Sequence, residues 1–222
     1  MKIRKENIMD TTYDIEKISH LIANHHGLFG VFANPGFGTT TLLLQLTHQS
    51  TKQKGGTAVF FSLEASKEYL LNRMSHIGLS IENIIIDDTP SPPLRYITDV
   101  IENTESLSLI VIDYLQLLDE NVAGKLKNIS QKYCIPILIG GHLPRNSGDF
   151  DSKHRPDMYC LTFIKQHDYL HMRDYDMLLL LHRDHDLERG IGTVNRYNIS
   201  NECELIMKIN RFGELDNFRL LM

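Results

Sequence analysis

The chain has 222 residues, the length of a single domain with a sizeable core, and 42% of its residues are hydrophobic. Its formal net charge of -5 excludes a globally basic surface, so nucleic-acid binding would depend on local loops or on an oligomer. No run approaches the ~18 apolar residues of a membrane span, and three widely spaced cysteines predict reduced core thiols in a cytoplasmic protein: Cys134, Cys160 and Cys203.

The predicted elements alternate between helix and strand along most of the chain. An amphipathic helix is predicted at 13–24. Apolar runs of strand length follow at 28–33, 57–62, 108–113, 135–140, 176–181 and 203–209. Helical patterns separate the first five runs, at 40–52, 66–77, 92–104 and 121–133, with a weaker pattern around 160–172. This alternation predicts an α/β fold with a mainly parallel sheet that is buried on both faces.

The C-terminal part of the chain has a different pattern. Segments 203–209 and 216–221 are joined by a short stretch of turn-forming residues, which predicts a terminal antiparallel hairpin. Segment 144–157 carries the longest loop signal, and loops of that length in a compact domain are usually functional or disordered.

Residues 33–40 have the form of a phosphate-binding loop without its lysine: Ala33-Asn34-Pro35-Gly36-Phe37-Gly38-Thr39-Thr40. The loop stands between a predicted strand and a predicted helix, and we include Thr41 in the nucleotide site. Gly36 and Gly38 allow the backbone to fold tightly, so that its N–H groups converge on phosphate oxygens. Thr40 takes the place of the hydroxyl that binds Mg²⁺. Thr39 stands where the lysine would reach the β- and γ-phosphates.

Two other predicted strands lead to acidic residues. Four apolar residues precede Asp113, and in P-loop proteins such an acid holds Mg²⁺. The alternative for Asp113 is an ordinary capping or turn aspartate. Glu64 follows the other strand, where a carboxylate can polarise the water that attacks the γ-phosphate. The alternative is a helix start in which Ser62 or Ser66 is the cap and Glu64 favours the helix dipole.

Three strings give the sequence a family resemblance: Phe61-Ser62-Leu63-Glu64-Ala65-Ser66-Lys67-Glu68, Ile86-Asp87-Asp88-Thr89-Pro90 and Leu109-Ile110-Val111-Ile112-Asp113-Tyr114-Leu115-Gln116-Leu117. Together they resemble the C-terminal RecA-like motor domain of DnaB-type replicative helicases, from about Tyr13 to the C-terminus. The resemblance implies an N-terminal extension with a linker helix at 1–26 and a RecA-like P-loop ATPase domain at 27–222. In that family the loop reads Ala-Arg-Pro-Ser-Met-Gly-Lys-Thr, so Thr39 is the departure.

The resemblance also implies roles for individual residues. Glu64 matches the catalytic glutamate of the family, and Asp113 matches the Mg²⁺-associated acid. His142 falls where the family has a glutamine proposed to sense the γ-phosphate. Arg211, in Asn210-Arg211-Phe212-Gly213, matches an arginine finger that acts on the nucleotide of the neighbouring subunit. Arg183, in His182-Arg183-Asp184, matches a position near the base pocket.

The resemblance implies ATP and Mg²⁺ as cofactors and single-stranded DNA as a partner. It further implies a homo-oligomer or a replication-protein partner, with the helix at 13–24 packed on a neighbour. The DNA-contacting loops correspond to a stretch of mixed charge, for which a solvated loop is an equal alternative: Arg145, Asp149, Asp151, Lys153, His154 and Arg155.

Two readings of the function follow. Thr39, Asn34 and His142 each weaken recognition of the γ-phosphate, and losing one charged transition-state contact costs on the order of 2.7–4 kcal/mol. The first reading is a DnaB-like ATPase that moves on single-stranded DNA with impaired activity. The alternative is a catalytically degenerate, helicase-like module that acts through oligomer or partner contacts. A recombinase-type RecA relative is less favoured, because the specific strings are those of the helicase family.

Overall fold

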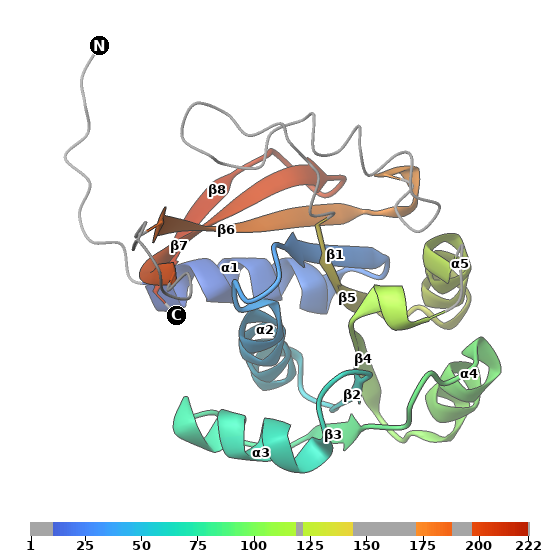
Figure 1. Ribbon diagram of the computed structural model, residues 1–222. Helices are drawn as coiled ribbons and strands as arrows, with labels where there is room; N and C mark the ends of the chain where they lie inside the picture. Colours follow the sequence, from blue (N-terminus) through green and yellow to red (C-terminus); the bar gives the residue numbers. More distant parts are fainter. Residues whose placement is uncertain (1–10, 119–121, 144–171, 188–196, 222) are drawn as a thin grey trace.

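A computed structural model describes residues 11–118, 122–143, 172–187 and 197–221 of the chain (Figure 1). Its elements follow in the order α1 (Thr11–Asn24), β1 (Leu28–Ala33), α2 (Thr39–Lys54), β2 (Thr57–Ser62), α3 (Lys67–His76), β3 (Ile84–Asp87), α4 (Leu94–Asn103), β4 (Leu107–Asp113), η1 (Leu115–Leu117), α5 (Val122–Tyr133), β5 (Ile137–His142), η2 (Met172–Asp174), β6 (Met177–Leu187), β7 (Tyr197–Asn210) and β8 (Asn217–Leu221). The two η elements are short 3₁₀ helices.

The strands form one eight-stranded sheet in the order β3-β2-β4-β5-β1-β6-β7-β8. All neighbours from β3 to β6 are parallel. Parallel neighbours need crossover connections, and helices supply most of them here. β7 runs antiparallel to β6, and β8 runs antiparallel to β7. The predicted mainly parallel sheet and the terminal hairpin are therefore confirmed.

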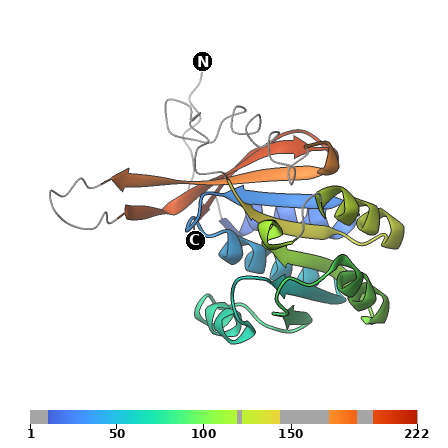
Figure 2. The same ribbon diagram turned by 45° about the vertical axis from the view of Figure 1, so that its right-hand side comes forward.

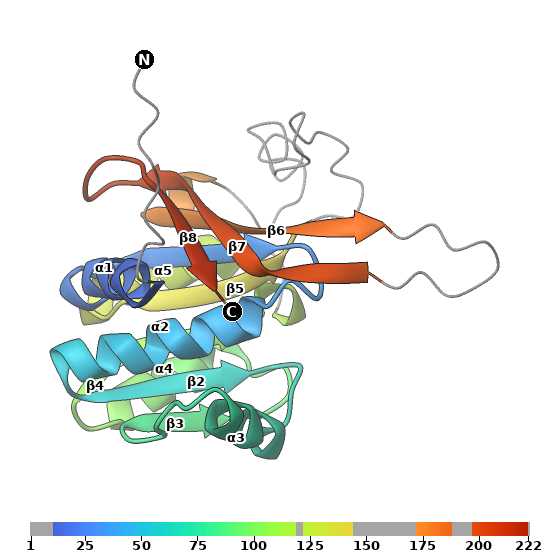
Figure 3. The same ribbon diagram turned by 90° about the vertical axis from the view of Figure 1, so that its left-hand side faces the viewer.

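Helices cover both faces of the sheet (Figure 1). α1, α2 and α3 contribute side chains to one apolar core, whereas α4 and α5 contribute to a second core on the opposite face. β1 is buried along its whole length, as expected for a parallel strand that is covered on both sides. Figure 3 shows α2 crossing in front of the strands, so the helix that follows the loop at 33–40 is held against the middle of the sheet.

Helix α1 packs on its own chain. Ile18 and Ile22 are fully buried in the core that α2 shares, and their spacing of four places them on one face of the helix. The Lys17 ammonium lies 2.6 Å from the Asp216 carboxylate, just before β8. The apolar face of α1 is thus used within the chain, and packing of its exposed side on a neighbouring subunit stays a prediction.

Three features differ from the sequence prediction. β3 is a strand of four residues at the edge of the sheet, where no strand is predicted. β6 and β7 extend past 176–181 and 203–209, because their pairing continues through polar sequence to Leu187 and Tyr197. Figure 2 shows this outer part as a two-stranded arm that projects beyond the rest of the sheet. Cys134 is exposed instead of lying in the core.

Several predictions lie outside the residues that the structure describes. They are the loop at 144–157 with its mixed charges, Cys160, and the helix at 160–172 except for Met172, which begins η2. Among the helices that are described, none has both the length and the hydropathy needed to cross a membrane.

Candidate functional site

The loop between β1 and α2 has the backbone of a phosphate cradle. Gly36 has a φ of 84° and Gly38 a φ of 100°, both in the left-handed region that glycine tolerates. The Phe37 N–H donates to the Asn34 carbonyl at 3.2 Å, which closes the turn. A Cβ added to Gly36 would meet no atom within 4 Å, so the outer side of the loop is open. Successive N–H groups in such a turn form an anion-binding concavity.

Helix α2 begins at Thr39 directly after this loop. Its N-cap is Gly38, and no side chain caps it. The first N–H groups of a helix lack partners within the helix, and the helix dipole places partial positive charge there. The start of α2 therefore offers donors to an anion that is held by the loop.

Strand register brings the other candidate residues to the same edge of the sheet. At the end of β1, Ala33 pairs with His142, the last residue of β5. At the end of β2, Ser62 pairs with Asp113, the last residue of β4. Glu64 lies two residues after Ser62, just beyond the end of β2. Ligands of open α/β sheets bind at this carboxyl edge, so the loop and the three candidate side chains share one region.

Asp113 is only 3% exposed, and the Thr40 side chain hydrogen-bonds to its carboxylate. The pKa of Asp113 is raised from 3.8 to about 6, mainly because of burial. The negative charge of Glu64 adds to this rise, whereas the Thr40 hydrogen bond and the positive charge of Arg73 oppose it. One oxygen, Oδ1, has no hydrogen-bond partner among the described residues. A buried carboxylate oxygen without a partner is unfavourable by itself, and a cation would satisfy it. The Asp113 carboxylate is therefore suited to hold a cation.

Asp113 and Thr40 fit a magnesium ion. A hydroxyl and a carboxylate are oxygen ligands, which Mg²⁺ prefers, and Mg²⁺ usually keeps several waters and binds substrate phosphates as well. Within the described ranges, no group of three or more His, Cys, Asp or Glu side chains is arranged to hold a metal. A hydroxyl and one carboxylate suit an ion whose other ligands are waters and phosphate oxygens.

Thr39 is buried, with 7% of its surface exposed, and its side chain lies against β5. A Cβ added to Gly140 would come within 3.2 Å of the Thr39 methyl carbon and 3.1 Å of Asp113 Oδ1. The methyl group and the carboxylate therefore both pack near the backbone of Gly140. Thr39 fills space beside the acid and brings no charge to the loop.

Glu64 is exposed, and its charge raises the pKa values of both Asp113 and Tyr114, after the larger effect of burial on each. It precedes α3 and is not in the first turn of that helix. Ser66 is the N-cap, because its side chain accepts a hydrogen bond from the Tyr69 N–H at 3.3 Å. Ser66 thus fills the capping role that the alternative reading proposed, and Glu64 lies within electrostatic reach of Asp113 at the end of β4.

His142 lies beside the segment that follows Asp113. Its ring stacks edge-on against Tyr114, with centroids 4.2 Å apart. Its carbonyl accepts a hydrogen bond from the Gln116 side chain at 2.8 Å. The next residue, Leu143, donates its N–H to the Ala33 carbonyl at 2.8 Å. His142 is thereby linked to both the start of the loop and the end of β4.

Arg183 belongs to β6, which pairs with β1 on the other side. Its neighbour His182 is buried, and the His182 ring lies 6.4 Å from the Phe37 ring in the loop. The Arg183 side chain hydrogen-bonds to the thiol of Cys203 on β7. Burial raises the pKa of this thiol, and the charge and hydrogen bond of Arg183 partly oppose that rise. Arg183 therefore lies at the same edge as the loop, in contact with Cys203.

Arg211 lies at the opposite edge. It follows β7, and its N–H donates to the Asp176 carbonyl at 2.8 Å, while the Asp176 N–H donates to the carbonyl of Leu28 at the start of β1. The guanidinium donates to the carbonyls of Tyr175 at 3.0 Å and Arg173 at 2.7 Å. The chain does not bring Arg211 to its own loop.

Arg73 on α3 lies at the site and was not among the predicted residues. Its Nε donates to the Thr41 hydroxyl at 3.0 Å, and its Nη2 donates to the same oxygen. The charge of Arg73 also opposes the rise in the pKa of Asp113 that burial causes. No motif marks it. The available signal is helical spacing: Leu70 and Met74 are buried, so Arg73 borders the face of α3 that packs on α2.

Comparison with solved structures identifies proteins with a similar fold. One structure, described as an ATPase domain, aligns with a TM-score of 0.71 and 18% identity over 99% of this chain and 90% of that one. A DnaB-like replicative helicase, described with its interactions with primase, aligns with a TM-score of 0.69 and 18% identity. That alignment covers 88% of this chain and 56% of the helicase. A KaiC-like protein from the archaeon Pyrococcus horikoshii aligns with a TM-score of 0.58 and 18% identity, over 87% of this chain and 84% of that protein. At these identities the likeness shows the fold alone, which is RecA-like.

The chain spans 56% of the length of that DnaB-like replicative helicase. No curated protein matches the sequence. The model of the DnaB-like helicase C terminal domain family matches residues 77–222. Because this match covers more than half of the 222 residues, the chain belongs to the DnaB-like helicase C-terminal domain family.

Proposed function

We propose that the chain is a helicase-type motor domain that binds ATP with Mg²⁺ at the loop 33–40 and hydrolyses it slowly. The observation that carries the proposal is the pairing of Thr40 with the buried Asp113 carboxylate, whose Oδ1 has no partner among the described residues, directly below an open phosphate cradle. A helix start without a cap, beside a hydroxyl and an orphaned carboxylate oxygen, suits a phosphate chain that carries a divalent cation.

In this proposal each residue has a defined task. The N–H groups of the loop and of the first turn of α2 bind the phosphates. The segment consists of Asn34, Pro35, Gly36, Phe37, Gly38, Thr39, Thr40 and Thr41, of which Pro35 shapes the turn and has no N–H to donate. Thr40 and Asp113 would hold Mg²⁺, which would supply positive charge beside the transferred phosphoryl group. Glu64 orients the attacking water, and His142 donates a hydrogen bond to the γ-phosphate. Arg183 lies toward the base, and Arg211 acts on a neighbouring subunit.

Slow hydrolysis follows from Thr39. The residue has no charge, and its methyl carbon packs against Gly140 of β5. Removing one charged or dipolar contact from a transition state typically lowers a rate by about 10²–10³. Binding depends less on this one contact, because the backbone donors of the loop remain in place.

The test is thermal unfolding with and without ATP and Mg²⁺. A ligand that binds only the folded state at 100 times its Kd adds ~2.7 kcal/mol to the free energy of unfolding, so the melting temperature must rise. The rise should shrink when Mg²⁺ is chelated, and an Asp113→Asn variant should lose the Mg²⁺-dependent part. Absence of any shift at millimolar ATP–Mg²⁺ would reject nucleotide binding.

A second candidate is a degenerate module that acts only through contacts with copies or partners. The burial of Thr39 and the engagement of Arg211 by carbonyls of its own chain favour it. The unfolding experiment separates the two candidates, since the module would show no shift with ATP. Both candidates allow single-stranded DNA, a replication protein or further copies of the chain as partners, because one structural neighbour is described with its interactions with primase.

A further inference from the structure

We propose that Arg73 supplies the bound triphosphate with the positive charge that the loop itself lacks at Thr39. The inference rests on the proposed nucleotide binding and adds one residue to it. The residue belongs to α3, outside the loop, and reaches the first turn of α2 because α3 packs beside the start of that helix.

The position of the guanidinium is fixed by neutral partners. Nε donates to the Thr41 hydroxyl at 3.0 Å, Nη2 donates to the same oxygen, and Nη1 donates to the Tyr69 hydroxyl at 3.1 Å. Thr41 follows the residue that hydrogen-bonds to Asp113. Arg73 is therefore anchored one residue from the proposed magnesium ligand, in the first turn of α2.

Arg73 has no close ion-pair partner among the described residues, although its charge acts on the buried Asp113 carboxylate. Within the part of the chain that the structure describes, no carboxylate oxygen lies within 4.0 Å of its guanidinium nitrogens. The side chain is nevertheless half-buried. A partly desolvated cation without an ion pair is unfavourable unless an anion joins it. Arginine has five N–H donors, and the three recorded bonds leave two of them for phosphate oxygens.

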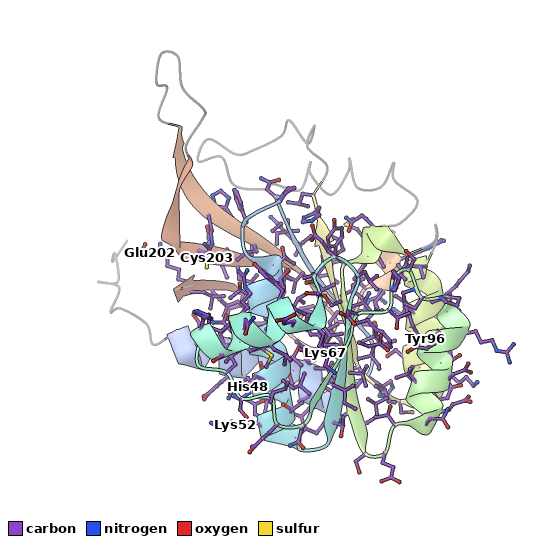
Figure 4. The ribbon with its side chains drawn as sticks, turned by 60° about the horizontal axis from the view of Figure 1, so that its bottom comes forward. His48, Lys52, Lys67, Tyr96, Glu202 and Cys203 are labelled. Carbon is purple, nitrogen blue, oxygen red and sulfur yellow. The ribbon has the colours of Figure 1, made fainter. Side chains whose placement is uncertain are left out.

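Lys67 and Lys208 do not provide this charge in the structure. The backbone N–H of Lys67 donates to Asp88 at 2.8 Å, and its charge is among the influences that lower the pKa of Asp87 at the end of β3. Figure 4 shows Lys67 at the beginning of α3 and Tyr96 on α4. The Tyr96 hydroxyl donates to Asp87, so both residues lie near the end of β3. Lys208 belongs to β7, near the amino edge. Arg73 is the cation whose charge acts on Asp113.

The experiment measures equilibrium binding of ATP–Mg²⁺ and of AMP to the chain and to three variants. Arg73→Gln should weaken ATP binding by tenfold or more and leave AMP binding within about twofold, because the contact is with the outer phosphates. Arg95→Gln is the matched control, since Arg95 is an exposed residue on α4, and it should bind like the unchanged chain. Thr41→Val keeps the Arg73 cation but removes the hydroxyl that accepts its hydrogen bonds. The loss of ATP affinity in Thr41→Val should therefore be smaller than the loss in Arg73→Gln.

Adding Thr39→Lys to the series tests whether the charge is the relevant property. The lysine should raise ATP affinity more in the Arg73→Gln background than in the unchanged chain, because either cation then serves the same phosphates; such non-additivity is expected of neighbouring groups. All variants are first checked for unchanged unfolding behaviour.

The outcomes separate this inference from the proposed function. If the unchanged chain fails to bind ATP–Mg²⁺, the proposed function is wrong. If the chain binds and Arg73→Gln binds equally well, the assignment of Arg73 is wrong while nucleotide binding stands. Equal losses in Arg73→Gln and Thr41→Val would also overturn the assignment, because the hydrogen bond and not the charge would then matter.

Discussion

At the residue scale, the string around Asp87 and Asp88 serves mainly as a structural joint. The Asp87 carboxylate accepts hydrogen bonds from the Thr89 N–H at 2.9 Å and from the Tyr96 hydroxyl at 2.7 Å. The Asp88 carboxylate accepts from the N–H of Lys67, the first residue of α3. Two adjacent acids thus tie the end of β3 to both α3 and α4. One of the strings that marks the family therefore holds the helix that carries Arg73.

The buried carboxyl of Asp113 predicts a pH dependence of stability. Its pKa is raised from 3.8 to about 6 in the folded state, so the folded state binds this proton more tightly than the unfolded state does. The contribution to stability is fully present below pH 3.8 and is lost as the pH rises through about 6. The loss is on the order of 3 kcal/mol.

The measurement is urea unfolding of the chain and of Asp113→Asn from pH 4 to 7 without nucleotide. The free-energy difference between the two should grow over that interval in favour of the asparagine variant, because an amide cannot ionise. ATP–Mg²⁺ should bind the unchanged chain more weakly below pH 6, where Asp113 is protonated. A constant difference across the interval would contradict the raised pKa.

Thr39→Lys should increase ATP affinity or turnover. The substitution adds an ammonium group to a loop that keeps its shape, although the longer side chain must leave the space beside Gly140 that the threonine fills. A gain of up to about 10²–10³ in rate is expected from one charged contact. Thr39→Met has similar length without charge and is the control for steric effects in steady-state ATPase assays. Native turnover at the rate of replicative helicases would show that the charge is already compensated.

At the element scale, the fold could be read from the sequence wherever burial produced the pattern. β1 and β4 were predictable because both of their faces are covered and nearly every side chain is apolar. β3 was missed because it has only four residues and lies at the edge, where Ile85 is 48% exposed. The outer parts of β6 and β7 were missed because backbone pairing, and not burial, defines them.

The candidate site shows the same limit. Residues at strand ends, such as Asp113 and His142, could be placed because parallel register brings strand ends together. Arg73 could not, because the angle at which α3 packs on α2 decides what it touches, and no local pattern encodes that angle.

Helix α1 provides a prediction for the element as a whole. Ile18 is fully buried between α1 and α2, so Ile18→Ala should lower the free energy of unfolding by about 2–5 kcal/mol. His20 lies on the exposed side of the same helix, and His20→Ala should change stability by less than about 0.5 kcal/mol. Chemical denaturation of both variants checks this. Equal effects would mean that α1 is not part of the folded core in solution.

At the scale of the whole molecule, the sheet separates two functional candidates. The loop leaves β1 at its carboxyl end, whereas Arg211 lies near Leu28 at the amino end of the same strand. Six residues at ~3.3 Å each place the two edges roughly 20 Å apart. An arginine side chain does not span that distance. If Arg211 acts on a nucleotide, that nucleotide belongs to another copy of the chain.

Arg211 is also held in a definite place at its edge. Its Nε lies 3.7 Å from an oxygen of Asp176, which Lys127 approaches more closely at 3.0 Å. The Arg211 side chain remains 49% exposed. The guanidinium is thus oriented by carbonyls and a shared carboxylate while part of it faces outward, where a second copy could meet it.

These positions predict the mode of assembly. A finger at one edge and a loop at the other edge require head-to-tail, heterologous contacts, which lead to a ring or a filament. The apolar face of α1 is buried within its own chain, and we expect contact between copies to be weak. We therefore expect a monomer in dilute solution, and association at high concentration or with ATP–Mg²⁺ and single-stranded DNA. Sedimentation velocity under these conditions tests this, with Arg211→Ala as the variant that should lose the ATP-dependent part. A stable two-fold dimer that buries Arg211 away from any loop would rule out the finger role.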